Sequence, residues 1–140
     1  MVFIKTLLQL LLGAFLLSAG TSHLGSNRIE FLAQVPTWLP LDPDFVVVAS
    51  GLVEITLGVL LIATALIFKK YRAVVGVIAG VFFILIFPGN INQYVNQIDA
   101  FGLDTDAKRL IRLFFQPPLV AWAIWSTSAW QLVRKILKVS

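Results

Sequence analysis

The segment that decides the fold is residues 45–68, FVVVASGLVEITLGVLLIATALIF, in which Glu54 is the only charged residue. A helix needs about 20 apolar residues to cross the hydrocarbon core of a bilayer, which is roughly 30 Å thick. Lipid offers no hydrogen-bond partner to an open backbone, so helices are the structures that can span it. The segment therefore predicts a transmembrane helix.

Three more stretches share this character, and we predict transmembrane helices over about residues 3–24, 73–91 and 113–133 as well. Apolar residues make up 59% of the 140-residue chain and charged residues 13%, whereas a soluble domain is about half apolar and roughly a quarter charged. A chain of this length is expected to form one domain. We therefore predict an all-α membrane protein in which residues 1–140 form a single four-transmembrane-helix bundle.

The first apolar stretch has a second interpretation. Lys5, an apolar core and then Ser18-Ala19-Gly20 resemble a secretory signal with a small-residue cleavage site. The apolar run is long for a signal peptide, and without it the two termini would fall on opposite sides of the membrane. We therefore expect it to be retained as the first helix.

The basic residues predict the orientation of the bundle. With four spans, the N-terminus, the loop between the second and third helices and the C-terminal tail share one side, which carries seven basic residues: Lys5, Lys69, Lys70, Arg72, Arg134, Lys135 and Lys138. The other side carries four, Arg28, Lys108, Arg109 and Arg112, together with Glu30 and the aspartates. Basic residues favour the cytoplasmic side, so we predict cytoplasmic N- and C-termini in a bacterial cytoplasmic (inner) membrane.

The composition also excludes several classes of function. The chain has no cysteine, which excludes disulfides, thiolate metal sites and thiol redox chemistry by this chain alone. The net charge is +4, but the basic residues sit at the ends of apolar runs and form no arginine-rich stripe, so nucleic acid is not an expected partner.

The predicted topology places the unusual polar residues of all four helices at one depth, in the outer half of the membrane. We predict that a polar cluster or ligand site forms there from His23, Ser50, Glu54, Asn90, Arg112, Gln116 and Trp122. Glu54 would lie roughly 8–14 Å below the outer boundary, at about 1.5 Å of rise per residue. A carboxylate at that depth costs several kcal/mol unless it is paired, hydrated or protonated, so Glu54 should face the bundle.

Three interpretations of Glu54 stay open. It can be a structural group that pairs with Arg112 or bonds to His23, Asn90 or Gln116; it can belong to a ligand or proton site; or it can contact a partner protein. His23 alone is more often a structural histidine. With one carboxylate it supplies too few ligands for a metal, so no metal site is predicted.

Small residues predict how the helices pack. Gly51 and Gly58 share a helix face with Glu54, and Gly76 and Gly80 form a GxxxG pattern in the third helix. Such residues allow helix backbones to approach closely. We expect the GxxxG pattern to serve packing inside the bundle rather than dimerisation.

The same polar residues lie in motifs that resemble the DoxX family of small membrane proteins. The matching segments, in order, are Ala19–His23, Val35–Pro40, Ser50–Ile55, Pro88–Ile91 and Arg109–Gln116. The chain departs from the family pattern at Leu24, where Phe is usual, and at Phe114-Phe115-Gln116, where Pro-Leu-Gln is frequent. The resemblance implies a four-helix membrane bundle. It implies no one activity, because relatives are linked to quinone-coupled sulfur oxidation, to oxidative or thiol stress, or to receptor assembly.

These observations lead to three functional hypotheses. The first is a non-enzymatic accessory or assembly protein that binds a membrane protein partner or a second copy, and holds a lipid-like or quinone molecule at the polar cluster. The second is a quinone-interacting subunit of an oxidoreductase system, with Phe83, Phe87, Phe114 and Trp122 lining the quinone slot. The third is transport of a small solute or a proton. No nucleophile or paired carboxylates indicate an enzyme acting on its own.

Overall fold

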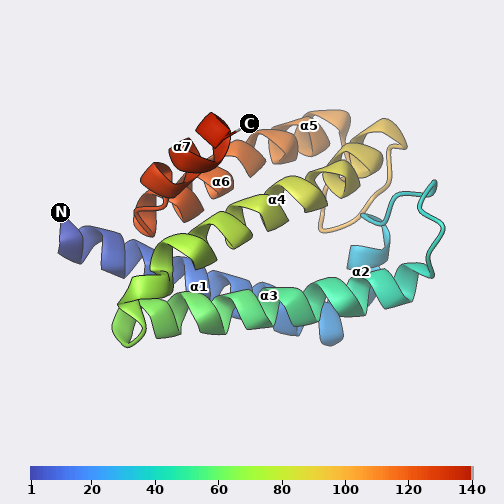
Figure 1. Ribbon diagram of the computed structural model, residues 1–140. Coiled ribbons are helices and arrows are strands. Elements are labelled where there is room, and N and C mark those ends of the chain that lie inside the picture. The colour runs from blue at the N-terminus through green and yellow to red at the C-terminus, as the bar shows by residue number, and fades with distance from the viewer. Residues whose placement is uncertain (140) are drawn as a thin grey trace.

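The computed structural model describes residues 1–139, and in that range it is built from helices with no β-strand. In chain order the helices are α1 (Val2–Leu24), α2 (Arg28–Leu32), α3 (Pro43–Leu66), the short 3-10 helix η1 (Lys69–Tyr71), α4 (Arg72–Val95), α5 (Asp106–Phe114), α6 (Gln116–Ser126) and α7 (Trp130–Val139). Figure 1 shows α1, α3 and α4 as the long rods of the bundle, with α5 and α6 following one another along α4.

Within residues 1–139, three helices are long and apolar enough to cross a membrane: α1, α3, and α4 with the η1 turn before it. They confirm the first three predicted helices and are consistent with a membrane protein. The predicted end of the third helix near residue 91 is wrong, because α4 continues through Pro88 to Val95. Proline removes one backbone donor, and neighbouring side chains can satisfy the carbonyls near such a site. The carbonyl that loses its helical donor at Pro88 is that of Ile84, and Gln116 Nε2 donates to the adjacent Phe83 carbonyl at 2.6 Å.

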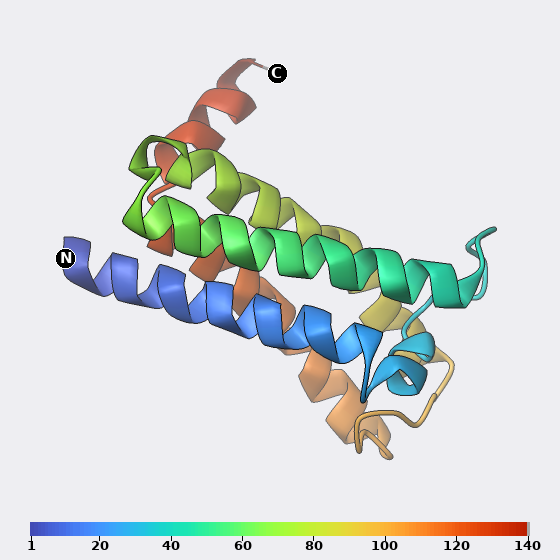
Figure 2. The same ribbon diagram turned by 90° about the horizontal axis from the view of Figure 1, so that it is seen from below.

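Two pairs of glycines bring α1 and α3 into backbone contact. A Cβ added to Gly20 would lie 2.6 Å from the Gly51 carbonyl oxygen, and one added to Gly58 would lie 2.7 Å from the Gly13 carbonyl oxygen. Neither pair has room for a side chain, so the two helices lie side by side along their length (Figure 2). The predicted small-residue face of α3, with Gly51 and Gly58, is therefore confirmed.

The GxxxG pattern of α4 is used inside the bundle. A Cβ on Gly76 would clash with the side chain of Thr127, and one on Gly80 would lie 3.2 Å from Ile124. These contacts hold α4 against α6. Between the α1–α3 pair and the α4–α6 pair lies an apolar core. Its residues include Leu12, Leu16, Leu57, Leu61, Ala79, Phe83 and Ala123.

The prediction of one helix over residues 113–133 is wrong, because the structure divides this region among α5, α6 and α7. Pro117 and Pro118 have no N–H and start a new helix, α6, after Phe115. Ser128 has a φ of 59°, in the left-handed region, and lies in the turn that separates α6 from α7. On the N-terminal side, Thr105 caps α5 by accepting from Lys108 N at 3.3 Å, so the helix begins in a region predicted to be loop.

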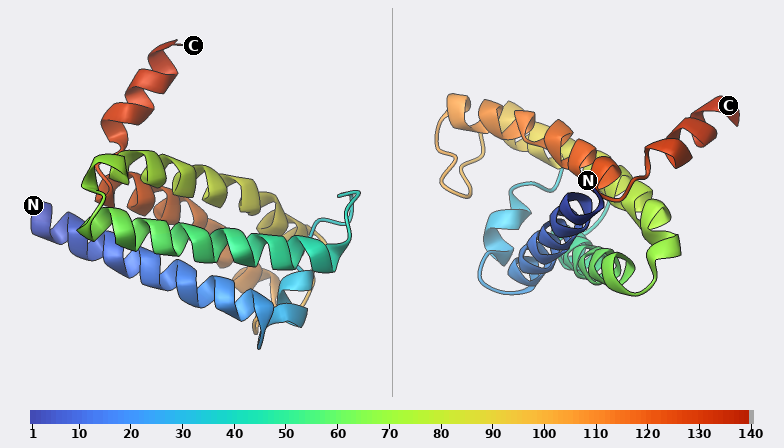
Figure 3. Two further views of the ribbon diagram at one scale, coloured as in Figure 1. Left: turned by 60° about the horizontal axis from the view of Figure 1, so that its bottom comes forward. Right: turned by 90° about the vertical axis from the view of Figure 1, so that its left-hand side faces the viewer.

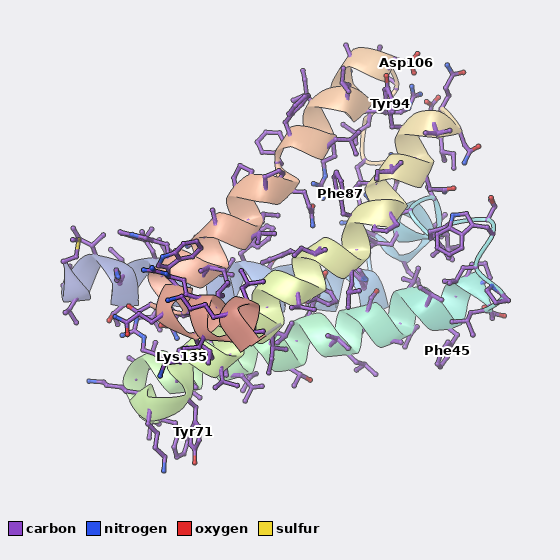
Figure 4. All side chains as sticks on the ribbon, turned by 45° about the horizontal axis from the view of Figure 1, so that its top comes forward. Phe45, Tyr71, Phe87, Tyr94, Asp106 and Lys135 are labelled. Atoms are coloured by element: carbon purple, nitrogen blue, oxygen red, sulfur yellow. The ribbon has the colours of Figure 1, made fainter. Side chains whose placement is uncertain are left out.

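The bundle has two chemically different ends. One, here called the η1 end, holds the N-terminus, η1 and α7; the other, the α2 end, holds α2, the start of α5 and the connecting loops (Figure 1). Figure 4 shows Tyr71 and Lys135 at the η1 end, and Phe45, Tyr94 and Asp106 at the α2 end. α7 leaves the bundle at an angle after the Ser128 turn (Figure 3).

Candidate functional site

A cavity of about 530 Å³ lies inside the bundle toward the α2 end. All five of the helices α1, α3, α4, α5 and α6 contribute to its wall, together with α2 and the segment after it. Most of the wall is apolar, and its polar side chains are His23, Gln34, Ser50, Glu54, Asn90, Arg112 and Gln116. The structure thus brings together six of the seven residues predicted to form the site.

Trp122 is the predicted site residue that does not reach the cavity. Its indole Nε1 donates to the Leu8 carbonyl at 2.9 Å, which ties α6 to α1. Trp122 lies six residues after Gln116, or about 9 Å further along α6 toward the η1 end. Of the aromatic residues predicted to line a quinone slot, Phe83 reaches the cavity, Phe114 is exposed, and Phe87 lies in a different hollow.

His23 and Glu54 face each other in the wall of the cavity. His23 Nε2 lies 3.4 Å from Glu54 Oε2, and both side chains are buried. The geometry is not that of a hydrogen bond, and no described residue donates to Glu54 Oε2. Glu54 therefore faces the bundle, as predicted, and the charged or polar group described next to it is His23.

The other nitrogen of His23 fixes its tautomer. Nδ1 lies 3.2 Å from the Val47 carbonyl oxygen and 3.0 Å from Ser50 Oγ, and the Ser50 hydroxyl itself donates to the Val47 carbonyl. A carbonyl oxygen only accepts, so we assign a proton to Nδ1. Nε2 and Oε2 would then repel unless one of them also carries a proton. The pair is thus arranged to hold one proton between an imidazole and a carboxylate.

Arg112 projects into the same cavity and makes no hydrogen bond or ion pair with another described residue through its side chain. The interpretation in which Glu54 is pinned by Arg112 is therefore wrong in this structure, where Glu54 lies closest to His23. A guanidinium has five N–H donors and cannot lose its charge. The cavity thus presents a set of strong donors that the protein itself does not use.

Asn90 and Gln116 form a satisfied part of the wall. Asn90 Nδ2 donates to Gln116 Oε1 at 3.1 Å, and Gln116 Nε2 donates to the Phe83 carbonyl. Both side chains are buried. These bonds tie α6 to the middle of α4 and hold the first turn of α6 against the cavity.

The segment around α2 covers the cavity at the α2 end. The Phe31 ring lies 3.4 Å from the His23 ring, centroid to centroid, and 4.7 Å from the Phe101 ring. Glu30 accepts from the Phe101 backbone N–H at 2.6 Å, so the loop between α4 and α5 joins the same cover. Residues 27–44 lie between the first two predicted helices, and no helix was predicted there. Phe31 and Phe101, two large apolar residues within polar loops, are the signal that would have indicated a part in the cavity lining.

Gln34 fastens this cover to α4. Its amide donates to Gln93 Oε1 at 3.2 Å, while Asn92 donates to the Val35 carbonyl at 3.3 Å. A Cβ added to Gly89 would clash with the Gln34 carbonyl oxygen, so the covering segment rests directly on the α4 backbone. We call residues 28–39 the cap.

The charged pairs at the α2 end hold loops rather than line the cavity. Arg28 bonds to Asp44, which raises the pKa of the guanidinium, and Lys108 bonds to Asp104, which lowers the pKa of that carboxyl. Arg109 is buried and binds Asp106 at 2.8 Å and also Asp99. Among residues 1–139 no group of three or more His, Cys, Asp or Glu side chains is placed to hold a metal ion.

The comparison with known proteins places this arrangement in a family. The family model for a domain of unknown function, DUF8561, matches residues 12–127, a range that contains every polar side chain of the cavity. The chain belongs to the DUF8561 family. The matched range of this DUF8561 protein ends before α7. No curated protein and no solved structure matches the chain.

Proposed function

We propose that this DUF8561 protein crosses a bacterial cytoplasmic membrane four times, with both termini in the cytoplasm. α5 and α6 together form the fourth span, because residues 106–126 would rise about 31 Å at about 1.5 Å per residue. The α2 end is then the outer end. The positive-inside rule supports this orientation, since the seven basic residues of the η1 end have no acidic neighbour there.

We further propose that the cavity holds an amphipathic, membrane-soluble molecule with its polar end at His23, Glu54 and Arg112. The observation that carries this proposal is that Arg112 lines the cavity without a hydrogen bond to any described residue, opposite apolar walls. An ionisable group inside a membrane span is expensive unless it serves a partner or a ligand. A cavity of this volume lies within the range of small-molecule sites.

The role we favour is that of a non-enzymatic accessory or assembly protein in complex with another membrane protein or a second copy. The resemblance to the DoxX family supports the importance of the cavity, because each of the five matching segments contributes a lining residue: His23, Pro36, Glu54, Asn90 and Arg112 are examples. The bound molecule would then stabilise the folded bundle or be contacted by the partner protein.

A quinone is the more specific candidate, and a quinone-interacting subunit of an oxidoreductase system is the second function. A quinone carbonyl oxygen needs a donor beside an apolar slot, and Arg112 supplies such donors. The His23–Glu54 pair can hold a proton close to them. Electrons would come from the partner protein, because the cysteine-free chain has no thiolate ligands for a redox cluster.

Transport of a solute or a proton is the third and weakest proposal. Toward the η1 end, the cavity is followed in α1 and α3 by Leu12, Leu57 and Leu61, all buried in the apolar core. A transport path would have to cross this layer. We therefore favour a site that opens toward the outer leaflet and the α2 end.

Native mass spectrometry of the protein, extracted gently from its own membrane, tests the proposed function. We expect a small molecule of defined mass to be retained by the wild type and lost in Glu54→Gln and in Arg112→Gln. Lys108→Gln removes an equal charge from an exposed position outside the cap and the cavity wall and should keep the molecule. If the wild type retains no small molecule, or if both cavity variants retain it as well as Lys108→Gln does, the proposal is wrong.

A further inference from the structure

A second hollow, of about 600 Å³, lies on the outside of the bundle between α4 and α6. Ile84 and Phe87 of α4 form one wall, Val120 and Ala121 of α6 form the other, and Trp125 and Trp130 close it at the η1 end. Figure 4 shows Phe87 on the side of α4 that faces α6. Gln116 is the one residue of this wall with a charged or amide side chain, and that amide is already bonded. We call this hollow the α4–α6 groove.

The length of the groove matches one leaflet of a bilayer. Along α6 it runs from Gln116 to Trp125, which is about 14 Å at about 1.5 Å per residue. A hydrocarbon core is roughly 30 Å thick, so this is close to half of it. In the topology proposed above, Gln116 lies near the middle of the fourth span. The groove therefore belongs to the cytoplasmic leaflet, while the cavity belongs to the outer one.

Positive charge gathers where the groove ends. Lys5 Nζ lies 5.3 Å from the centroid of the Trp125 ring and donates to Ser128 Oγ at 3.2 Å. Arg134 follows Trp130 by four residues and is its neighbour on the surface of α7. All seven acidic residues of the chain lie outside this end of the molecule.

α7 has the pattern of a helix that lies in a membrane surface. Gln131, Arg134, Lys135 and Lys138 follow the spacing of one helix face, and Val133, Ile136 and Leu137 fall on the opposite one. Such a helix buries its apolar face at the level of the lipid headgroups and keeps its basic face in water. The turn at Ser128 directs α7 away from the bundle axis, as this placement requires (Figure 3).

We propose that the α4–α6 groove binds an acyl chain of an anionic phospholipid of the cytoplasmic leaflet, whose headgroup contacts Lys5 and Arg134. The apolar groove fits a hydrocarbon chain, and the two tryptophans lie at the depth where aromatic residues meet headgroups. The charge of the η1 end decides the class of lipid, because cations there favour an anionic headgroup over a zwitterionic one. The choice of leaflet rests on the proposed topology; the site itself does not depend on a ligand in the cavity.

Native mass spectrometry with defined lipids tests this site. The full chain is mixed with equal amounts of phosphatidylglycerol and phosphatidylcholine of identical acyl chains, and the retained lipid is identified by mass. We expect phosphatidylglycerol to be retained in preference. Each basic contact near a headgroup is worth about 1 kcal/mol, or about fivefold, so the double variant Lys5→Gln with Arg134→Gln should weaken this retention about 30-fold.

Two matched pairs of variants locate the site. Ala121→Trp fills the groove and should abolish retention of either lipid, whereas Ala14→Trp, on an exposed position of α1, should not. Arg28→Gln removes a charge at the opposite end and should leave the preference unchanged. The proposal is overturned if phosphatidylglycerol has no advantage, if Ala121→Trp binds as Ala14→Trp does, or if a polypeptide is retained instead.

Glu54→Gln separates this proposal from the proposed function. It lies in the cavity and should release the cavity molecule while phosphatidylglycerol stays bound. If the wild type holds no cavity molecule but the lipid result is as expected, the proposed function fails and the groove stands. If instead the wild type holds a cavity molecule but shows no preference for phosphatidylglycerol, the groove proposal fails and the proposed function stands.

Discussion

His23 Nε2 lies 3.4 Å from Glu54 Oε2, although no hydrogen bond joins them. His23 and Glu54 are buried groups that can share a proton, and they lie between α1 and α3 at the edge of the cavity. This arrangement differs from a structural ion pair. A structural pair would satisfy the lone pairs of its carboxylate, since a buried charge left without partners costs several kcal/mol. The relationship therefore favours a ligand or proton site over a structural pin, and this difference can be measured.

Replacing Glu54 by Gln should not destabilise the protein once bound small molecules have been removed. Gln keeps the shape of the side chain, and Oε2 accepts no hydrogen bond from a described residue. We expect the Tm in detergent to stay within about 2 °C of the wild type. Breaking a true buried pair costs about 3–5 kcal/mol, or more than about 6 °C, and a fall of that size would show that Glu54 is a structural pin.

Gln9 provides the control for that measurement. It is also buried and polar, but its Nε2 donates to the Leu61 carbonyl at 2.9 Å and to Thr64 Oγ1 at 3.1 Å. Gln9→Leu should lower the Tm by about 2–4 °C, because each interhelical bond of this kind contributes about 0.6 kcal/mol or more.

Gly20→Ala should weaken the contact between α1 and α3. The added methyl group would lie 2.6 Å from the Gly51 carbonyl oxygen, and backbone cannot move aside as a side chain can. We expect a loss of about 1–3 kcal/mol in the free energy of unfolding, measured by denaturant titration in detergent. Gly25→Ala is the matched control, since its methyl group would meet the Thr21 carbonyl at an ordinary 3.6 Å. Equal stability of the two variants would contradict the packing described for α1 and α3.

Gly89→Ala should lift the cap without unfolding the bundle. The new methyl group would clash with the Gln34 carbonyl oxygen, next to the Gln34–Gln93 and Asn92–Val35 hydrogen bonds that join the cap to α4. The chain has no cysteine, so Ser50→Cys gives one thiol in the cavity wall. We expect a water-soluble maleimide to label this thiol faster when Gly89→Ala is also present. Gly80→Ala, far from the cap and opposite the movable Ile124 side chain, should not change the rate.

Thiol labelling of intact cells tests the orientation. Ser26→Cys places an exposed thiol at the α2 end, and Gln131→Cys places one on α7 at the η1 end. A membrane-impermeant reagent should label the first in cells and the second only after the membrane is opened. The opposite pattern would reverse the bundle, and labelling of both in intact cells would mean that the fourth span does not cross.

The long apolar helices were predictable from the sequence because length and composition alone decide them. The meeting of His23, Ser50, Glu54 and Arg112 was predictable as well, since topology fixes the depth of each residue and a buried charge must face inward. These two rules need no knowledge of side-chain contacts.

The partner of Glu54 was not predictable in the same way. Depth places His23 and Arg112 equally close to it, and only the rotation of each helix, set by the glycine contacts of α1 and α3, decides between them. The cap was missed because residues 28–32 form a helix of little more than one turn, which has no periodic signal of its own. The break at Ser128 was missed because a left-handed residue without glycine leaves no mark in the sequence.

The glycine contacts between α1 and α3 have a consequence for how the protein is made. Both helices are complete once the first 66 residues have left the ribosome, and no later residue takes part in the Gly13–Gly58 and Gly20–Gly51 contacts. The two helices can thus insert as a finished hairpin that already holds His23 against Glu54. α4 and α6 follow in the chain and complete a half-built site, so the cavity can close only after α6, which carries Gln116, has been synthesised.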